Sequence, residues 1–215
     1  MKTNAVVFGA GGHAKVVADI LRLRGHQVAG FIDEVSPQRR GDIFFGSPIL
    51  GGREDLLALR AQGVRHVIVA FGDNARRIAA GDFIEASGFE LITAIHPSAI
   101  LGGEVHIGAG SMLAAGAVVN AGSIIGKHCI VNTCASVDHD CVLAEGVSIG
   151  PGGRLAGKVR VGCAAFIGMG ASIIERRQIC AGAVVGAGAV VTKDVLDTVV
   201  VVGVPARVLK RVQSA

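Results

Sequence analysis

An aliphatic residue recurs at every sixth position between residues 107 and 191, and this repeat constrains the fold more than any other feature. A period of six matches neither the 3.6 residues of a helical turn nor the two-residue alternation of an ordinary strand. It predicts a coil of three short strands joined by tight turns, with the aliphatic residue of each hexad pointing inward. The repeat consists of Ile107, Leu113, Val119, Ile125, Val131, Val137, Leu143, Ile149, Leu155, Val161, Ile167, Ile173, Ile179, Val185 and Val191.

Fifteen hexads make five full coils, which would stack at about 4.8 Å, the ordinary spacing between strands. Small residues lie two positions before most of the aliphatic ones and would fill the corners of the core. The chain has 32 Gly, 8 Phe, no Trp and no Tyr, which suits such a tightly stacked, repetitive β-structure. The small residues are Ser111, Ala117, Ser123, Cys129, Ala135, Cys141, Gly153, Ala165, Ala171, Ala183 and Ala189.

The first part of the chain has a different pattern, in which a glycine turn connects a strand to a helix. Residues 5–8 form a short apolar run, and Gly9-Ala10-Gly11-Gly12-His13-Ala14 follows it. Residues 15–24 have apolar positions at helical spacing, and a second apolar run, residues 28–32, ends at Asp33-Glu34. This order is typical of the front of a nucleotide-binding βαβ unit.

Glycine allows a tight turn and a close approach of the backbone to phosphate, and the following helix start offers free N–H groups. An acid after the second strand can accept hydrogen bonds from a ribose or a base. A tight turn without any ligand is the alternative interpretation. The region before the repeats has only about 95 residues, too short for the usual double dinucleotide-binding fold, so a mononucleotide or a nucleotide sugar fits better.

The remaining elements of the first half continue the α/β pattern. We expect helices over residues 53–62 and 75–87 and strands over 67–71 and 91–93, with a turn at residues 72–74. Ligands of open parallel sheets bind at the carboxyl ends of the strands. Three strand-end segments should therefore converge on one substrate pocket, which gives as candidate residues Gly11, Gly12, His13, Asp33, Glu34, Gly72 and Asn74.

Composition excludes several classes of function. The net charge of +4 is mild, the basic residues are scattered and aromatic residues are few, so nucleic-acid binding is disfavoured. The five Cys form no CxxC pair, and we interpret them as reduced, small, buried residues of a cytoplasmic protein without a metal site. We expect no signal peptide, because the start MKTNAVVFGAGG has no cationic segment followed by a long apolar run. We expect no insertion into a membrane, because no apolar run reaches about 18 residues.

Asp138-His139-Asp140 is the unusual feature of the repeats, because the surrounding segment has few charges. Val137 points inward in the hexad register, so His139 should lie near a turn, where its side chain can leave the core. A solvated turn is one interpretation. The other is a general base, because a His with a pKa near 6.5 can accept a proton at neutral pH and a carboxylate beside it fixes its tautomer.

The hexads, the GAGGHAK turn, the GDN segment at 72–74, the HPSA junction at 96–99 and the VGVPA end at 202–206 together resemble one known family. They look like the trimeric hexapeptide-repeat acetyltransferases of the PglD/PerB/NeuD-like group, which act on nucleotide-linked amino sugars. The resemblance implies an α/β, Rossmann-like domain with a short parallel sheet (1–96), followed by a left-handed parallel β-helix with a C-terminal tail (97–215). It also implies a homotrimer and acetyl-CoA as co-substrate.

The resemblance assigns His139 as the general base and Asp140 as its partner, with Asp138 as the rival partner. It places His13 against the nucleotide sugar, with a structural capping role as the alternative. Some members have a His near CoA where this chain has Ser148. The resemblance also implies a CoA site between subunits. The backbone would approach the pantetheine arm at Gly168, Met169, Gly186 and Ala187, where small residues leave room. The cations for the CoA phosphates would be Lys193, Arg207, Lys210 and Arg211, with a solvated surface charge as the alternative for each.

Other functions remain open at this point. O-acetylation of a sugar such as a sialic acid would need the same base, and a nucleotide-sensing scaffold would need none. A γ-class carbonic anhydrase site is disfavoured, because His128 and His139 are eleven residues apart and form no H-x4-H pair. The sequence leaves the nucleotide (UDP, GDP or CMP), the sugar and the oxyanion donor undetermined, although the turn at residues 144–146 is a candidate for the donor.

Overall fold

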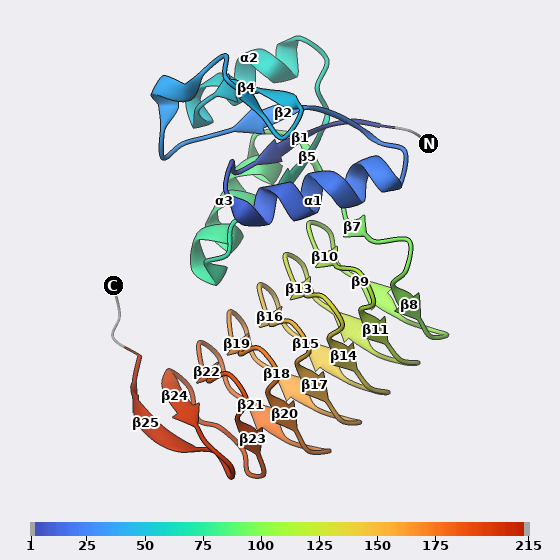
Figure 1. Cartoon of the computed structure of the whole chain (residues 1–215), viewed down its shortest axis with the longest axis vertical. Coiled ribbons are helices and arrows are strands. Elements are labelled where there is room, and N and C mark those ends of the chain that lie inside the picture. Colours follow the sequence, from blue (N-terminus) through green and yellow to red (C-terminus); the bar gives the residue numbers. More distant parts are fainter. Residues whose placement is uncertain (1–2, 213–215) are drawn as a thin grey trace. The chain divides into compact units, whose positions relative to one another are not determined.

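The computed structural model describes residues 3–212 and divides into two compact units at the Pro97–Ser98 boundary. The first unit is an α/β domain (Figure 1). Its sheet has the strand order β3-β4-β2-β1-β5-β6, and all pairs are parallel except the β3–β4 hairpin. The strands are β1 (Asn4–Phe8), β2 (Gln27–Ile32), β3 (Ile43–Phe44), β4 (Ser47–Gly51), β5 (His66–Val69) and β6 (Glu90–Leu91), and β7 (Ala94–Ile95) ends the unit.

In the described part of this domain, residues 3–97, the sheet is accompanied by three helices and two short 3₁₀ turns: α1 (Gly12–Leu23), α2 (Leu56–Ala61), α3 (Asn74–Ala86), η1 (Pro37–Arg39) and η2 (Arg53–Asp55). The glycine turn itself supplies the first turn of α1, so this helix begins at Gly12, ahead of the predicted start. The helix predicted over residues 53–62 is η2 followed by the short α2. The strand predicted over 91–93 is instead β6, and the β3–β4 hairpin was not predicted.

Apolar residues at alternating positions of the strands form the core of this domain. Val6 and Phe8 of β1 are buried in one cluster with Leu56 of α2 and Ile84 of α3, so α2 and α3 cover the same face of the sheet. The helix α1 packs against β1 and β2 through its buried stripe. The carboxyl ends of β1, β2 and β5 remain at one edge, where loops and helix starts carry the polar residues.

The second unit is the left-handed β-helix that the resemblance implies, built from the coils of three short strands that the six-residue period predicts (Figure 1). Its strands have two residues each, and the second residue is the aliphatic one of the hexad. Val118 pairs with Ser136 and Ser136 with Arg154, so each strand pairs in parallel with the strand that lies three hexads further along the chain. Three hexads therefore make one coil.

The strands fall on three faces. The first face contains β10 (Met112–Leu113), β13 (Ile130–Val131), β16 (Ser148–Ile149), β19 (Phe166–Ile167) and β22 (Val184–Val185). The second contains β8 (Ile100–Leu101), β11 (Val118–Val119), β14 (Ser136–Val137), β17 (Arg154–Leu155), β20 (Ser172–Ile173) and β23 (Val190–Val191). The third contains β9 (His106–Ile107), β12 (Ile124–Ile125), β15 (Val142–Leu143), β18 (Arg160–Val161) and β21 (Gln178–Ile179).

The aliphatic residues form the core of the β-helix. From Leu113 to Val191 every one of them is at most 2% exposed, and the small residues before them are buried too. The interpretation of all five cysteines as buried is wrong. Cys129 and Cys141 occupy the buried small position, whereas Cys134 and Cys163 lie in turns and are exposed, and Cys180 is half-buried.

Each hexad ends in a turn whose second residue has a left-handed backbone. Glycine holds this place in many turns, for example Gly122 with φ of +71°, but Asp140 holds it with φ of +57°. Asp tolerates this conformation better than most residues, so an acid can occupy a turn position that otherwise favours glycine.

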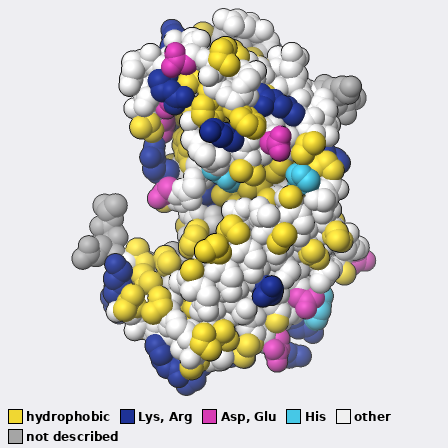
Figure 2. Space-filling model, viewed as in Figure 1, with side chains coloured by type: hydrophobic (Ala, Val, Ile, Leu, Met, Phe, Trp, Pro, Cys, Tyr) yellow, Lys and Arg dark blue, Asp and Glu magenta, His cyan; other side chains and the backbone are white. Residues whose placement is uncertain are grey.

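The last coil continues into a hairpin of β24 (Val199–Val202) and β25 (Arg207–Arg211), which pair antiparallel. All five residues of β25 are exposed. Figure 2 shows hydrophobic and basic side chains beside each other on this hairpin, at the lower left of the molecule. None of the helices within residues 3–212 combines the length and the apolar character that a membrane span requires.

The neighbouring residues Val118 and Val119 of β11 test the assignment of the core. Val119 is fully buried and Val118 is half-buried. We expect Val119→Ala to lower the free energy of unfolding by about 2 kcal/mol, because it leaves a cavity among packed aliphatic side chains. Val118→Ala should lower the free energy of unfolding by well under half as much, because the Val118 side chain is only half-buried. Urea unfolding followed by circular dichroism measures both, and equal losses would contradict the inward register.

Candidate functional site

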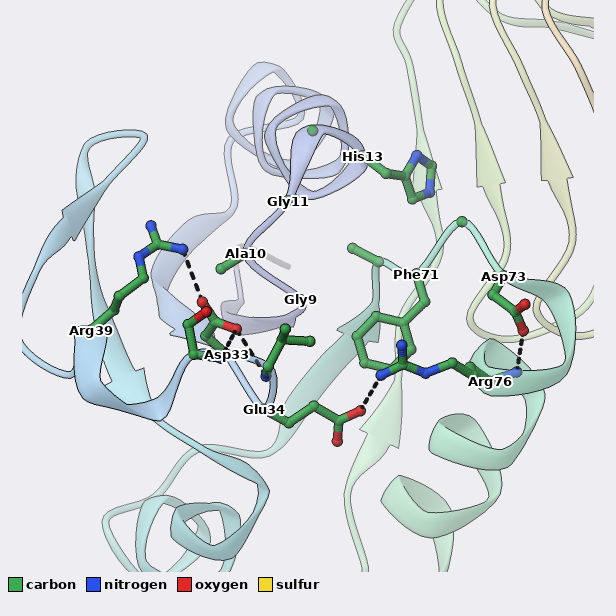
Figure 3. A pocket seen from close by; sticks show the side chains of 15 residues that line it. Gly9, Ala10, Gly11, His13, Asp33, Glu34, Arg39, Phe71, Asp73 and Arg76 are labelled. Carbon is green, nitrogen blue, oxygen red and sulfur yellow. Dashed lines mark hydrogen bonds and ion pairs between the residues drawn. The ribbon is translucent and has the colours of Figure 1, made fainter.

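A cavity of about 560 Å³ opens at the carboxyl edge of the sheet in the first unit (Figure 3). Its walls come from three strand ends and the segments that follow them, as the sequence predicted. The lining residues are Gly9, Ala10, Gly11, Gly12, His13, Asp33, Glu34, Val35, Ser36, Arg39, Ala70, Phe71, Gly72, Asp73 and Arg76. Of the candidate substrate residues, only Asn74 is not among them.

The glycines of the first turn have different physical roles. Gly9 has a φ of +132°, and a Cβ atom there would lie 2.9 Å from the carbonyl oxygen of Ala70, so the fold itself requires glycine. Gly11 and Gly12 would meet nothing within 4 Å. Gly11 is the N-cap of α1 and provides no side-chain cap. These two glycines therefore leave the N–H groups at the start of α1 open to the cavity, where they could bind an anion.

Asp33 mainly organises its own loop. Its side chain is almost buried and accepts hydrogen bonds from the backbone N–H groups of Val35 (3.1 Å) and Ser36 (3.0 Å). The guanidinium of Arg39 donates to the other carboxylate oxygen at 2.9 Å. Figure 3 shows this pair at one end of the cavity. Arg39 was not predicted as a site residue, because nothing near it in the sequence resembles a motif.

Glu34 and Arg76 form an ion pair across the cavity, with Nη2 of Arg76 3.0 Å from Oε1 of Glu34 (Figure 3). The Arg76 guanidinium also lies 5.4 Å from the centre of the Phe71 ring, and Phe71 packs edge-on against Phe8. Glu34 and Arg76, which are 42 positions apart in the sequence, thus form one wall of the cavity. Phe71 and Arg76 belong to no motif that the sequence shows, although both lie next to the predicted GDN turn.

The GDN turn is held from behind by a buried arginine. Asp73 caps α3 by accepting a hydrogen bond from the N–H of Arg76 at 2.8 Å. The side chain of Asn74 accepts one from Arg77 at 2.9 Å and does not line the cavity. Arg77, only 1% exposed, also donates to the carbonyl of Phe71 at 2.9 Å. Asn74 therefore supports the turn from behind. Asp73 lines the cavity in the position where Asn74 was expected.

His13, in the first turn of α1, lines the same cavity, and Figure 3 shows its ring on the side away from Arg39. Burial of the ring, together with the positive charge of Arg77, lowers the pKa of His13 from 6.5 to about 4. The imidazole is therefore neutral at pH 7, and it can both donate and accept a hydrogen bond.

The second candidate site lies in the β-helix, in the turn after β14. Val137 is buried as predicted, and His139-Asp140 form the turn. Nδ1 of His139 is 2.9 Å from a carboxylate oxygen of Asp140, and both side chains are 54% exposed. Asp138 instead accepts the backbone N–H of His139 at 2.8 Å and the side-chain amide of Asn120 at 2.9 Å. Of the two rival carboxylates, Asp140 is the one that contacts the ring.

The other ring nitrogen of His139, Nε2, has no hydrogen-bond partner within residues 3–212. A cavity of about 330 Å³ lies beside it, lined by residues of three successive coils: Asp138, His139, Ala156, Gly157, Lys158, Glu175 and Arg176. A neutral imidazole with Nδ1–H bonded to a carboxylate presents a lone pair on Nε2, the arrangement that a general base needs.

The predicted CoA residues do not gather around His139 within one chain. Gly168-Met169 and Gly186-Ala187 follow strands of the first face, so their turns lie at a different corner of the β-helix from the turn after β14. Met169 is 61% exposed. Lys193 follows β23 of the second face and is exposed.

Ser148 is nearly buried on the first face, in β16. The turn at residues 144–146, considered for the oxyanion, lies at the third corner. In this turn the backbone N–H of Ala144 donates to the carbonyl oxygen of Val161, and that of Gly146 donates to the carbonyl oxygen of Lys127, so both donors are already used.

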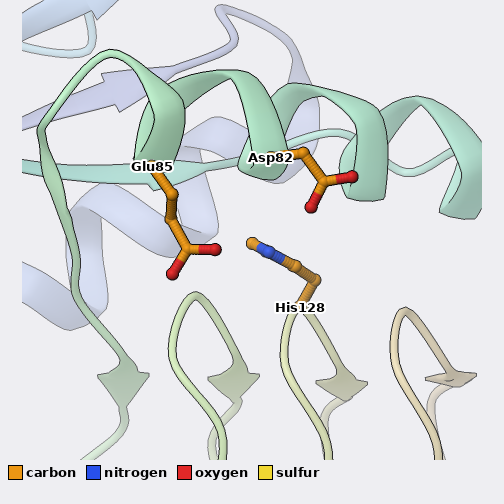
Figure 4. Close-up of side chains that lie close together, drawn as sticks. All are labelled: Asp82, Glu85 and His128. Carbon is orange, nitrogen blue, oxygen red and sulfur yellow. The ribbon is translucent and has the colours of Figure 1, made fainter.

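Asp82 and Glu85 lie on α3 of the first unit, and His128 lies in the turn before β13 of the second (Figure 4). Because they belong to separate units, these three side chains are not assigned as a metal site.

Comparison with known proteins places the chain among acetyltransferases. The model of the family described as "PglD N-terminal domain" matches residues 4–80. The GDP-perosamine N-acetyltransferase of Escherichia coli O157:H7 is 30% identical over 186 residues, which are 82% of each chain. The chain belongs to the PglD/PerB-like family of hexapeptide-repeat acetyltransferases. This finding confirms the resemblance inferred from the hexads and the glycine turn.

Several solved structures match nearly the whole chain, among them those of two PglD/PerB-like proteins. PerB from Caulobacter crescentus, in complex with CoA and GDP-perosamine, is 43% identical, with a TM-score of 0.92 over 95% of this chain and 96% of that one. The acetyltransferase domain of PglB from Neisseria gonorrhoeae FA1090, in complex with acetyl coenzyme A, is 38% identical, with a TM-score of 0.90 over 97% and 100%. A serine acetyltransferase of Mycobacterium tuberculosis is 34% identical, and the match spans only 47% of that protein.

The lowered pKa of His13 makes the stability of this PglD/PerB-like protein depend on pH. The unfolded chain binds a proton near pH 6.5 and the folded chain only near pH 4. The contribution of neutral His13 is thus fully present above pH 6.5 and is lost as pH falls toward 4. We expect the free energy of unfolding to fall on the order of 1–3 kcal/mol more in wild type than in His13→Asn over this range. Parallel urea-unfolding curves from pH 7.5 to 4.5 would contradict this assignment.

Proposed function

We propose that the protein is an N-acetyltransferase that moves the acetyl group of acetyl-CoA to the amino group of a nucleotide-linked 4-amino sugar. The observation that carries the proposal is the pair of His139 and Asp140, in which Nε2 of His139 faces a cavity. The similarity of the chain to PerB, solved in complex with CoA and GDP-perosamine, supports it. A GDP-linked amino sugar is therefore the first candidate, and a UDP-linked one is the second. No metal takes part in this proposal.

The proposed reaction is a direct attack on the thioester. The neutral amine attacks the acetyl carbonyl carbon, and its nitrogen becomes cationic as the N–C bond forms. Nε2 of His139 takes one proton from that nitrogen. The C–S bond then breaks, and the leaving thiolate of CoA receives this proton from His139 and departs as the thiol. The product is the amide, and the base returns to its neutral form.

Asp140 has a defined task in this scheme. Its carboxylate accepts the Nδ1–H of His139, so Nε2 keeps its lone pair and points into the cavity. The carboxylate also stabilises the imidazolium that forms when the proton arrives.

The cavity in the first unit is proposed to bind the nucleotide. The N–H groups at Gly11 and Gly12 suit the diphosphate, because they are open and belong to the start of a helix. The Phe71 face and the polar side chains of Glu34, Arg76 and Arg39 suit a base and a ribose. His13, neutral at pH 7, would offer one hydrogen bond to the sugar.

The protein is further proposed to act as a homotrimer in the cytoplasm. A CoA molecule that contacts both His139 and the turns of Met169 and Ala187 needs two corners of the β-helix. Two corners of adjacent copies can face each other in a closed ring of three. This argument supports a site built between subunits.

The variant His139→Asn tests the base. Asn fills a similar volume but cannot accept the proton, so we expect turnover to fall about a hundredfold or more. Release of the CoA thiol is measured with acetyl-CoA and a panel of GDP- and UDP-linked 4-amino sugars. His106→Asn, an exposed His of the same domain, is the matched control and should keep wild-type activity. Undiminished turnover in His139→Asn would remove this base from the mechanism, and turnover only with hydroxyl acceptors would indicate O-acetylation.

The variant Gly11→Ala tests the anion site. Its methyl group would extend into open space in the cavity, so the fold should keep its stability while nucleotide affinity falls about tenfold or more. Calorimetric titration with GDP and UDP measures the affinity.

Two glycine variants serve as controls for this test. In Gly103→Ala, the added methyl group would also meet nothing within 4 Å, but the residue lies in the other unit. This variant should change neither the stability of the fold nor the nucleotide affinity. Gly9→Ala should destabilise the domain, because its φ and the nearby Ala70 carbonyl exclude a side chain. Unchanged nucleotide affinity in Gly11→Ala would refute binding at the helix start.

A further inference from the structure

The turn that carries His139 is fixed to the coil before it by side chains that do not touch the imidazole. Oδ1 of Asp138 accepts two hydrogen bonds, one from the backbone N–H of His139 (2.8 Å) and one from Nδ2 of Asn120 (2.9 Å). Asn120 precedes Asp138 by one full coil and lies directly beneath it in the stack. The carboxylate thus links the backbone of the proposed base to the neighbouring coil.

Ser123, which is fully buried, holds the same turn at both ends. Its hydroxyl donates to the carbonyl oxygen of Asp138 at 2.8 Å and accepts the N–H of Cys141 at 3.0 Å. Asn120 and Ser123 together fix residues 138–141 from one side. Ser111 makes the same pair of contacts with Gly126 and Cys129 at another corner, so the Ser123 bonds are a general device of the coil, whereas the Asn120–Asp138 bond belongs to this turn.

Glycines in the neighbouring coils leave room for the catalytic pair. A Cβ at Gly157, one coil after His139, would lie 2.5 Å from Nε2 of the imidazole. A Cβ at Gly122, one coil before Asp140, would lie 2.9 Å from its Oδ1. The ring and the carboxylate therefore extend along the stack over glycines, and a small rotation of the backbone would move both out of these spaces.

We propose that Asp138 is a positioning residue, which with Asn120 clamps the backbone of His139 so that Nε2 is held over Gly157 and the cavity. Asp140 contacts the ring, and Asp138 fixes the direction from which the ring extends. This inference rests on the proposed function, because it assigns Asp138 a task in that reaction.

The ionisation of Asp138 agrees with a clamp. The hydrogen bond from Asn120, followed by that from the His139 N–H, holds the pKa of Asp138 below its usual value. The carboxylate stays charged across the working range of a histidine base, and hydrogen bonds to a charged acceptor are shorter and stronger than neutral ones.

The pair Asp138→Asn and Asp138→Ala separates the clamp from the charge. Both variants remove the negative charge, but the amide oxygen of Asn can still accept from Asn120 and from the His139 N–H. We expect Asp138→Asn to keep kcat within about threefold of wild type and Asp138→Ala to lose on the order of tenfold to a hundredfold, with little change in KM. Equal losses in the two variants would overturn the clamp, because the charge alone would then matter.

A double-mutant cycle adds a second test. Asn120→Ala should lower kcat severalfold in the wild-type chain and have no further effect in Asp138→Ala, because its partner is then absent. Additive losses would contradict a shared role. Thermal unfolding of each variant checks that the β-helix is intact.

Amide hydrogen exchange tests the clamp without any turnover. The His139 N–H should exchange at least about tenfold faster in Asp138→Ala than in wild type and stay slow in Asp138→Asn, because only alanine removes the acceptor. Exchange that does not respond to Asp138→Ala refutes the clamp, even in an active enzyme. Protected exchange together with no acetylation of any sugar would refute the proposed function and leave the structural clamp standing.

Discussion

The parallel pairing of each coil with the next, in steps of three hexads, is the constraint on which the site in the β-helix depends. Because the register is fixed by inward aliphatic residues, the neighbours of any turn residue are the equivalent residues of the coils before and after it. His139 therefore lies between Ala121 and Gly157, and Asp138 lies beside Asn120. A catalytic group on such a scaffold is oriented by residues that are remote in sequence but invariably adjacent in the stack.

The period of six was sufficient to predict every strand of the β-helix from Ile107 to Val191, because one buried position per hexad repeats without interruption. The contacts that line the cavity in the first unit could not be predicted in this way. Glu34 meets Arg76 across 42 residues, and Arg39 reaches Asp33 through a loop without periodicity. The choice between Asp138 and Asp140 depends on the left-handed backbone of Asp140, a conformation that sequence alone leaves open.

The charges of the cavity in the first unit are largely balanced within the protein. Arg39 pairs with Asp33, Arg76 pairs with Glu34, and His13 is neutral at pH 7. Neither of these arginines is therefore an uncompensated cation for a diphosphate. The helix start at Gly11 and Gly12 supplies partial positive charge without such a partner, so it is the better place for the phosphates. The base or ribose of the proposed nucleotide would compete for the paired side chains, and this competition would let the cavity select among nucleotides.

The His139–Asp140 pair is half exposed in the single chain, and an exposed pair of this kind has little electrostatic effect in water. The interaction of a carboxylate with a general base is stronger when water is excluded from the site. The two hydrogen bonds to Asp138 hold the backbone of His139, and the side chains of His139 and Asp140 are each 54% exposed. In the proposed homotrimer, a neighbouring copy that brings its Met169 corner against the ring would exclude water and would offer a surface to the pantetheine arm.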